Sequence, residues 1–152
     1  MKKIISAILI ISSMILLFGC ASVKMASKDE DTTLKKFTPP PPDKAGLYIF
    51  RNSFTGQALY KDIYVDSVFI GETANGVYLY LEISPGAHTI STESEFGENS
   101  VMLEVEGGKN YFAEQYITMG VFVGGAGIEM VDESVGMQQV LDCELAEQQK
   151  PK

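Results

Sequence analysis

Histidine, cysteine and basic residues are all scarce in this sequence. Its 152 residues include one histidine and two cysteines, and 12 lysines and arginines are outnumbered by 20 aspartates and glutamates. One histidine is too few for an ordinary zinc site, and two cysteines cannot form a disulfide-rich scaffold. A surplus of acid opposes binding to nucleic acid or anionic lipid, which basic side chains drive. We therefore expect no nucleic-acid partner, no metal and no other cofactor.

Long apolar runs are also missing after residue 18. The stretch 119–131 is apolar, but it is shorter than the ~20 residues that span a bilayer with ease, and it carries Glu129. Its GGAG segment, residues 124–127, lacks the lysine of a P-loop and the spacing of a dinucleotide-binding loop. The sequence predicts instead that these glycines form a turn, and that a last strand starts at Ile128.

The N-terminus has the three-part layout of a secretory signal. Two lysines precede an uncharged apolar run over residues 4–18, and Gly19 and Cys20 follow. This layout predicts a signal peptide over residues 1–19. Residues 17–20, LFGC, resemble the bacterial lipobox, which implies cleavage before Cys20 and lipidation of that cysteine. An uncleaved anchor and a secreted protein with an incidental cysteine are the alternatives.

Lipidation would attach the chain to a membrane. One acyl chain anchors only marginally, so the two or three chains of a lipoprotein are needed for stable attachment. Ala21 after the cysteine resembles the pattern of lipoproteins on the periplasmic face of the outer membrane. With Cys20 acylated, Cys143 has no partner within the chain. It is either buried, which we favour, or pairs between chains.

Residues 20–45 read as the lipidated N-terminus and a proline-rich linker. The segment is polar, mixed in charge and without helix or strand periodicity, and residues 39–42 are four prolines expected to form a stiff spacer. A proline-rich ligand for another domain is the alternative. At the other end, residues 147–152 are expected to form a disordered tail.

Residues 46–146 are predicted to form the folded body. Short runs of alternating apolar and polar residues are separated by turn signals such as Asp66-Ser67 and Ser84-Pro85-Gly86. Six such runs favour a mainly β fold, a small antiparallel β-sandwich-like domain of transthyretin or immunoglobulin character. After Asp132, a good helix N-cap, one C-terminal α-helix is predicted, with an apolar face of Met137, Val140, Leu141 and Leu145.

Residues 44–145 resemble the bacterial lipoproteins grouped as domain of unknown function 2846. The resemblance rests on the order of several short motifs, which are AGLYIFR at 45–51, VD at 65–66, IGE at 70–72, PG at 85–86 with His88, and GKNYF within 107–112. It implies a small β-rich envelope domain. It brings no established activity and no catalytic residues.

Two groups of residues were considered for chemistry. His88 lacks the nucleophile and second ligand that catalysis or metal binding would require, so we interpret it as a structural histidine near a turn. Several glutamates could offer oxygens to calcium, but no calcium-binding loop sequence is present and a solvated acidic face is the preferred interpretation. These glutamates are Glu93, Glu95, Glu98, Glu104 and Glu106. No catalytic residue is predicted.

Four aromatic residues offer a candidate binding surface. Tyr48, Phe50, Tyr78 and Tyr80 alternate out of phase with the aliphatic residues of their strands. If the aliphatic residues fill the core, the aromatic residues lie on the opposite face, where they could bind a partner. Cover by the C-terminal helix, or simple cross-strand pairing, would remove this surface.

The sequence thus predicts a lipid-anchored protein of the cell envelope that is not an enzyme. We expect a binding or structural module on the periplasmic side of the membrane, with an unknown envelope protein or glycan as its partner. A receptor for a glycan or small ligand on the aromatic face is the first alternative. An envelope enzyme without a recognisable catalytic motif is the second.

Overall fold

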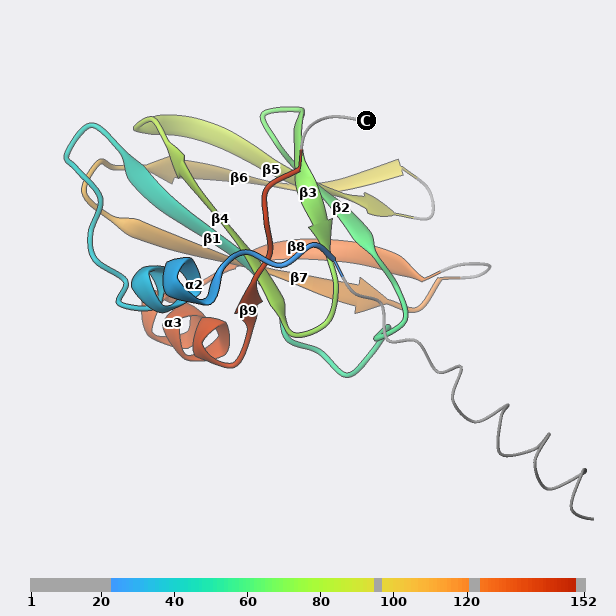
Figure 1. Ribbon diagram of the computed structural model, residues 1–152. Helices are drawn as coiled ribbons and strands as arrows, with labels where there is room; N and C mark the ends of the chain where they lie inside the picture. The colour runs from blue at the N-terminus through green and yellow to red at the C-terminus, as the bar shows by residue number, and fades with distance from the viewer. Residues whose placement is uncertain (1–22, 95–96, 121–123, 150–152) are drawn as a thin grey trace, which may run out of the picture.

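Two β-sheets packed face to face form the body of the protein (Figure 1). The computed structural model describes residues 23–94, 97–120 and 124–149. The first sheet, here the covered sheet, has the strand order β8-β7-β1-β4-β9, and the second, the open sheet, has the order β3-β2-β5-β6. The strands are β1 (Ala45–Arg51), β2 (Lys61–Val65), β3 (Val68–Thr73), β4 (Val77–Ile83), β5 (Gly86–Ser94), β6 (Gly97–Val105), β7 (Asn110–Thr118), β8 (Gly125–Val131) and β9 (Glu144–Leu145).

The predicted β-sandwich-like fold with a C-terminal helix is confirmed. Most neighbouring strands pair antiparallel, and the β2–β3 hairpin turns at Asp66 and Ser67, whose φ angles of 51° and 65° are those of a two-residue hairpin turn. Two pairs, β1 with β7 and β4 with β9, run parallel. Alternation within a strand does not reveal these parallel pairs, because it carries no information on which strand lies beside which.

The aliphatic residues of the alternating strands fill the space between the two sheets. Leu47 and Ile49 of β1 and Ile63 of β2 are fully buried there, together with Leu79 of β4 and Ile90 of β5. Their burial follows the period of two that the sequence shows. The main core therefore lies where the sequence places it.

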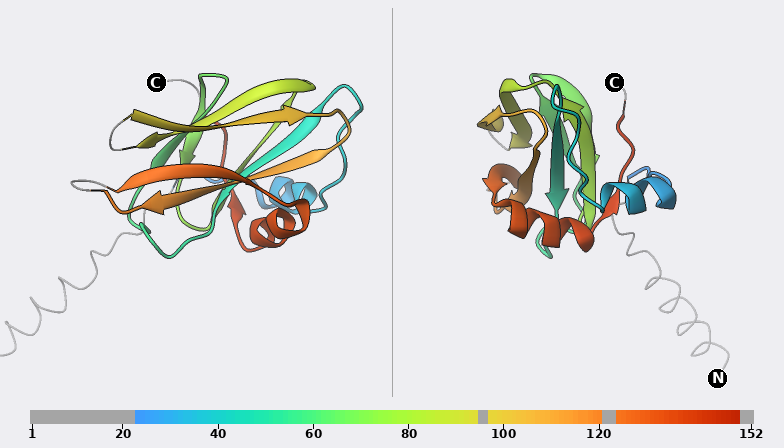
Figure 2. Two further views of the ribbon diagram at one scale, coloured as in Figure 1. Left: turned by 180° about the vertical axis from the view of Figure 1, so that it is seen from behind. Right: turned by 90° about the vertical axis from the view of Figure 1, so that its left-hand side faces the viewer.

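Two helices cover the outer face of the covered sheet and add a third layer. They are α2 (Lys28–Leu34) and α3 (Glu133–Leu141), and both lie on the same side of the sandwich (Figure 2). Helix α3 begins after Asp132 as predicted, although the Asp132 side chain makes no capping hydrogen bond. Its predicted apolar face is only partly correct. Val140 is buried and Leu141 is 54% exposed, while Leu145 lies beyond the helix, in β9.

The prediction that residues 20–45 form a linker is wrong for the described part of that range. Ser27 caps α2 by accepting a hydrogen bond from the Glu30 backbone N–H at 3.2 Å, and Val23 and Phe37 on either side of the helix are buried. A helix of this length depends on packing rather than on its own periodicity, because nucleating a helix is unfavourable. The described chain is therefore already part of the fold at Val23.

The predicted disordered tail is also wrong for residues 147–149. The Glu147 N–H donates to the Lys24 carbonyl, and the Gln149 N–H donates to the Ile70 carbonyl, both at 2.8 Å. The Gln148 amide Nε2 donates to the Tyr80 carbonyl, also at 2.8 Å. These backbone groups are satisfied by the body, so the chain continues across the edge of the sandwich. Residues 150–152 lie outside the described range.

The GGAG segment is strand rather than turn over its described residues. Gly125 to Gly127 belong to β8 and pair with Tyr116 to Thr118 of β7, while residues 121–123 lie outside the described range. A Cβ atom on Gly127 would overlap the Tyr116 ring. Glycine is therefore needed at Gly127 for close approach, as expected, but inside a strand. No helix of the described residues is long and apolar enough to cross a membrane.

Candidate functional site

The four predicted binding aromatics lie on the outer face of the covered sheet, as their alternation indicates. The prediction that they form an exposed surface is wrong. Tyr48, Phe50 and Tyr78 are at most 1% exposed, and only Tyr80 is half-buried. Both helical segments lie over them and contribute the residues of a second core, which include Phe37, Val140, Cys143 and Leu145.

Tyr48 lies at the centre of this second core. Its ring stacks on that of Phe112 with 5.0 Å between centroids, and it contacts the ring of Tyr80 at 4.7 Å. Its hydroxyl donates to the Leu34 carbonyl at the end of α2, at 2.9 Å. Burial, and secondarily the nearby Tyr80, raise the pKa of Tyr48. Tyr48 thus fixes α2 onto the sheet and is not available to a partner.

Tyr80 is the one predicted aromatic that borders a surface hollow. This hollow lies between α2 and the chain after β9, and its lining also includes Glu30, Leu34, Leu81 and Gln148. Three acidic residues, Glu30, Glu82 and Glu147, line it together with several apolar residues. No group of three or more histidine, cysteine or carboxylate side chains that could hold a metal occurs among the described residues.

Cys20, the predicted lipidation site, lies outside the described residues. Cys143, the second cysteine, is 1% exposed and belongs to the second core as a free thiol. Burial raises the pKa of Cys143 to about 12. The prediction that Cys143 is buried is confirmed.

His88 is held by two hydrogen-bond acceptors. Its Nδ1 lies 2.6 Å from Asp66 Oδ2, and its Nε2 lies 2.8 Å from the Ser84 carbonyl oxygen. Burial lowers the pKa of His88, but the hydrogen bonds to Asp66 and Ser84 and the charge of Asp66 outweigh it and raise the pKa overall. The Thr89 N–H and the His88 side chain lower the pKa of Asp66 despite some burial. This pair ties the β2–β3 turn to the start of β5, which is a structural role.

Among the described side chains, the predicted acidic residues do not form a cluster that could hold a metal. Glu93 pairs with Lys61 at 3.4 Å, and Glu106 pairs with Lys109 at 2.7 Å. The side chains of Glu95 and Glu98 lie outside the described residues. Each described pair is a local contact between opposite charges, partly exposed to solvent, and such contacts contribute little to stability.

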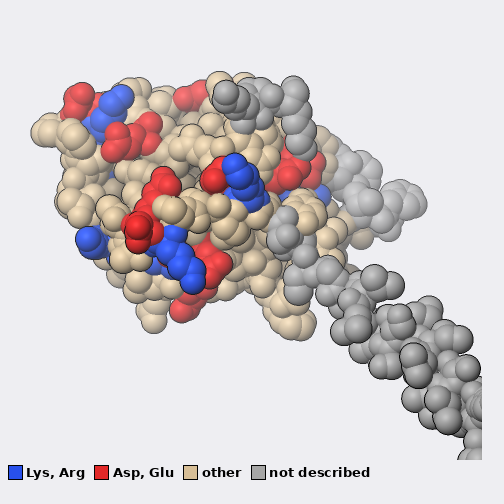
Figure 3. Space-filling model, in the orientation of Figure 1, with Lys and Arg blue, Asp and Glu red and all other residues tan. Residues whose placement is uncertain are grey.

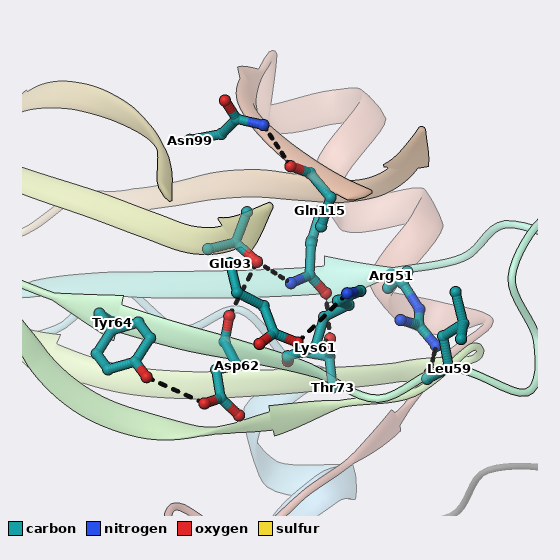
Figure 4. A network of polar contacts seen from close by, with 11 residues as sticks. Arg51, Leu59, Lys61, Asp62, Tyr64, Thr73, Glu93, Asn99 and Gln115 are labelled. Atoms are coloured by element: carbon teal, nitrogen blue, oxygen red, sulfur yellow. Dashed lines mark hydrogen bonds and ion pairs between the residues drawn. The ribbon is translucent and has the colours of Figure 1, made fainter. Parts of the chain in front are cut away.

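The structure contains a buried polar cluster between the sheets that the sequence did not predict (Figure 4). Thr73 Oγ1 and Gln115 Oε1 are hydrogen-bonded, and Gln115 Nε2 donates to Thr92 Oγ1 at 2.6 Å. Near them, Arg51 is fully buried, and its Nη2 donates to the Leu59 carbonyl at 2.5 Å. The one available signal was Arg51 itself, which follows Leu47 and Ile49 on the inward face of β1.

The Arg51 guanidinium is incompletely satisfied. Neither Nε nor Nη1 has a hydrogen-bond partner, and burial lowers the pKa of this group. A buried charge without a counter-charge normally costs stability. However, the described hollows of the surface are not lined by Arg51. The cluster therefore lies inside the core and does not border these hollows.

The end of the sandwich beyond Arg51, here the loop end, is formed by residues 52–60 and by residues 118–120 with Gly124. Parallel pairing of β1 with β7 brings the ends of both strands, and hence both loops, to the same end of the covered sheet. Phe54 is 86% exposed and Met119 is 94% exposed, and the two loops together line a shallow apolar hollow. Figure 3 shows no charged side chain at the lower right of the coloured surface, where the β1–β2 loop lies in Figure 1.

Two comparisons relate this chain to other proteins. The family described as "Protein of unknown function (DUF2846)" matches residues 41–126, which extend from the turn before β1 into β8. A Haemophilus influenzae protein, from strain Rd and named "Uncharacterized protein", is 46% identical over 145 residues. That similarity covers 95% of this chain and 86% of the relative. The family match contains the open sheet and strands β1, β4 and β7 of the covered sheet, ends within β8, and excludes α2, α3 and β9.

Proposed function

Since the chain belongs to the DUF2846 family of proteins of unknown function, we propose its role from its own residues. The protein is a lipid-anchored component of the bacterial cell envelope that acts by binding or by structural association rather than by catalysis. The observation that carries this proposal is the sequence of the first 20 residues, a basic start, an apolar run and LFGC. Lipid on Cys20 attaches the protein to the periplasmic face of the outer membrane.

The described structure supports a non-catalytic role. Among the described residues, both ring nitrogens of its one histidine contact acceptors, the Asp66 carboxylate and the Ser84 backbone carbonyl, and neither contacts a serine, threonine or cysteine nucleophile. General base catalysis needs such a nucleophile within reach. Cys143 is buried with a raised pKa and so is a poor nucleophile. The partner is an envelope protein or glycan.

Mass spectrometry of the membrane-extracted protein tests the anchor. We expect a mature chain that starts at a lipidated Cys20 and floats with membranes in a density gradient. The variant Cys20→Ala should lose both the lipid and the flotation, whereas Cys143→Ser is the matched control and should keep both. An unmodified Cys20, or an intact Met1 in the membrane fraction, would contradict the proposal.

Whether the protein lies in the outer or the inner membrane can be tested separately. Ala21 follows the lipidated cysteine, and aspartate at this position resembles the pattern of lipoproteins kept at the inner membrane. In a Gram-negative host, wild-type protein should sediment with outer membranes and Ala21→Asp with inner membranes. Co-sedimentation of both with the inner membrane would reject the outer-membrane assignment while leaving the lipid anchor intact.

A further inference from the structure

The folded body begins almost immediately after the anchoring cysteine. Val23 is only 9% exposed and belongs to the main core, and the neighbouring Lys24 carbonyl accepts the Glu147 N–H at 2.8 Å. Ala21 and Ser22 alone separate Val23 from Cys20. Three Cα-to-Cα steps span at most about 10 Å. A lipid on Cys20 would therefore hold the body against the bilayer instead of at the end of a long tether.

The loop end lies on the side where this anchor leaves the body. In Figure 1 the blue end of the described chain lies toward the right of the sandwich, as do the β1–β2 loop, the end of β7 and the start of β8. The turns at the opposite end, such as those next to Asp66 and Lys109, lie away from it. Proximity of the anchor thus favours contact between the loop end and the lipid.

The composition of the loop end suits a lipid interface. No aspartate, glutamate, lysine or arginine occurs in residues 52–60 or 115–120, although the chain as a whole is acidic. Its most prominent side chains are Phe54 and Met119, with Tyr60 43% exposed. The nearby Glu93 of the β5–β6 hairpin is paired with Lys61. These two loops themselves carry no charge that anionic lipid would repel, and apolar side chains at loop tips gain by entering the interface.

We infer that the loop end is a membrane-docking surface, and that Phe54 and Met119 enter the interface of the bilayer to which Cys20 is anchored. The inference rests on the proposed lipid anchor. Docking would fix the orientation of the body, with the opposite end and the outer face of the open sheet turned toward the aqueous phase. A second, non-covalent contact would also strengthen membrane attachment, since two linked contacts bind better than one.

The absence of tryptophan from the chain provides a direct test. Three single-tryptophan variants of the full chain, Phe54→Trp, Met119→Trp and Met102→Trp, report on three exposed positions. Met102 is 82% exposed on β6 of the open sheet and serves as the matched control. Each lipidated protein is purified and reconstituted into vesicles of phosphatidylethanolamine and phosphatidylglycerol, with and without brominated acyl chains. Circular dichroism checks the fold, and mass spectrometry checks the lipid on Cys20.

We expect tryptophan emission from positions 54 and 119 to shift to shorter wavelength in vesicles and to be quenched by the brominated lipid. Emission from position 102 should keep its water-exposed wavelength and intensity. If the proteins are lipidated and float with the vesicles, but positions 54 and 119 behave like position 102, the docking inference is overturned and the anchor stands. If Cys20 carries no lipid, the anchor and the docking inference fail together.

Discussion

Both neighbours of the His88 ring are acceptors, so only the protonated ring can donate to both. Asp66 supplies a carboxylate oxygen and Ser84 a backbone carbonyl oxygen. A neutral imidazole has one N–H and would leave one of these contacts without a proton. These two acceptors explain why the pKa of His88 is raised although burial opposes its charge.

The His88–Asp66 pair should make the stability of the protein depend on pH. Because the folded-state pKa of His88 is raised, its contribution is complete below the unfolded pKa of about 6.5 and is lost as pH rises through the folded value. Because the pKa of Asp66 is lowered, its contribution is present above the unfolded pKa and is lost as pH falls through the folded value. The His88–Asp66 pair therefore stabilises the protein most at pH values between these two transitions.

Urea unfolding measures this effect. Going from about pH 5.5 to pH 8.5, wild-type protein should lose a few tenths to about 1 kcal/mol relative to His88→Gln, since Asp66 is half-exposed and solvent screens the pair. Thr89→Ser, which keeps the backbone N–H bonded to Asp66, should retain the wild-type dependence. An identical pH profile for wild type and His88→Gln would contradict the prediction.

Arg51 should cost the fold stability rather than contribute it. Its guanidinium is fully buried and donates one hydrogen bond, to the Leu59 carbonyl, and it has no carboxylate partner among the described residues. We expect Arg51→Met to raise the free energy of unfolding by about 1 kcal/mol. The variant no longer has to desolvate a charged guanidinium, and this gain exceeds the cost of leaving the Leu59 carbonyl unpaired. Arg51→Lys keeps the charge and should bring no such gain. A loss of stability in Arg51→Met would show that the guanidinium has a partner.

At the scale of elements, the two helical segments decide what the covered sheet can do. They turn a face that could have bound a partner into a second core. Helix α3 lies against β7, where Gly136 sits so close to Phe112 that a Cβ would overlap its ring. Glycine normally weakens a helix, so its use here reflects the close approach of helix and sheet.

Gly136→Ala should therefore destabilise the protein despite improving helix propensity. Alanine gains about 1 kcal/mol of propensity. Overpacking against Phe112 costs roughly 1–3 kcal/mol and should outweigh it. Gln138→Ala, at an exposed position of α3, is the control and should change the free energy of unfolding by less than about 0.5 kcal/mol. A stabilised Gly136→Ala protein in chemical unfolding would mean that α3 is not packed this closely.

The N-terminal segment should likewise behave as part of the fold. The Phe37 ring lies 5.4 Å from that of Tyr48 and 5.9 Å from that of Phe112. Phe37→Ala should lower the free energy of unfolding by about 3–5 kcal/mol, because it leaves a cavity in the second core. Lys36→Ala, at the exposed neighbouring position, should have little effect. Equal midpoints for the two variants in thermal unfolding would indicate a tether, as the sequence alone predicts.

At the scale of the whole molecule, two hydrophobic cores hold the protein together. The described residues contain no disulfide. Cys143 is a free, buried thiol whose pKa is raised to about 12 by burial. Under the proposed acylation of Cys20, Cys143 would have no cysteine partner within the chain. Stability should therefore come from packing between the three layers and should not depend on redox conditions.

Thiol labelling tests this view of the molecule. In native protein at neutral pH, Cys143 should react with iodoacetamide far more slowly than a free model thiol, because the reactive thiolate is disfavoured and inaccessible. In urea it should react as fast as the model thiol, and the midpoint of labelling should match that of unfolding. A reducing agent should leave the midpoint unchanged. Rapid labelling of native protein, or a shift on reduction, would contradict burial as a free thiol.

The sequence by itself determined the alternation of the strands, the tight turn at Asp66-Ser67 and the start of the last helix, because these depend on neighbouring residues. It also placed Tyr48 and Tyr78 on the face opposite the aliphatic residues. Only the tertiary structure decided whether that face meets solvent, since its cover comes from Phe37, in the segment before the first strand, and from Val140, far away in the chain. The same applies to the parallel strand pairs and to the burial of Arg51. Such contacts join distant segments, and no local period encodes them.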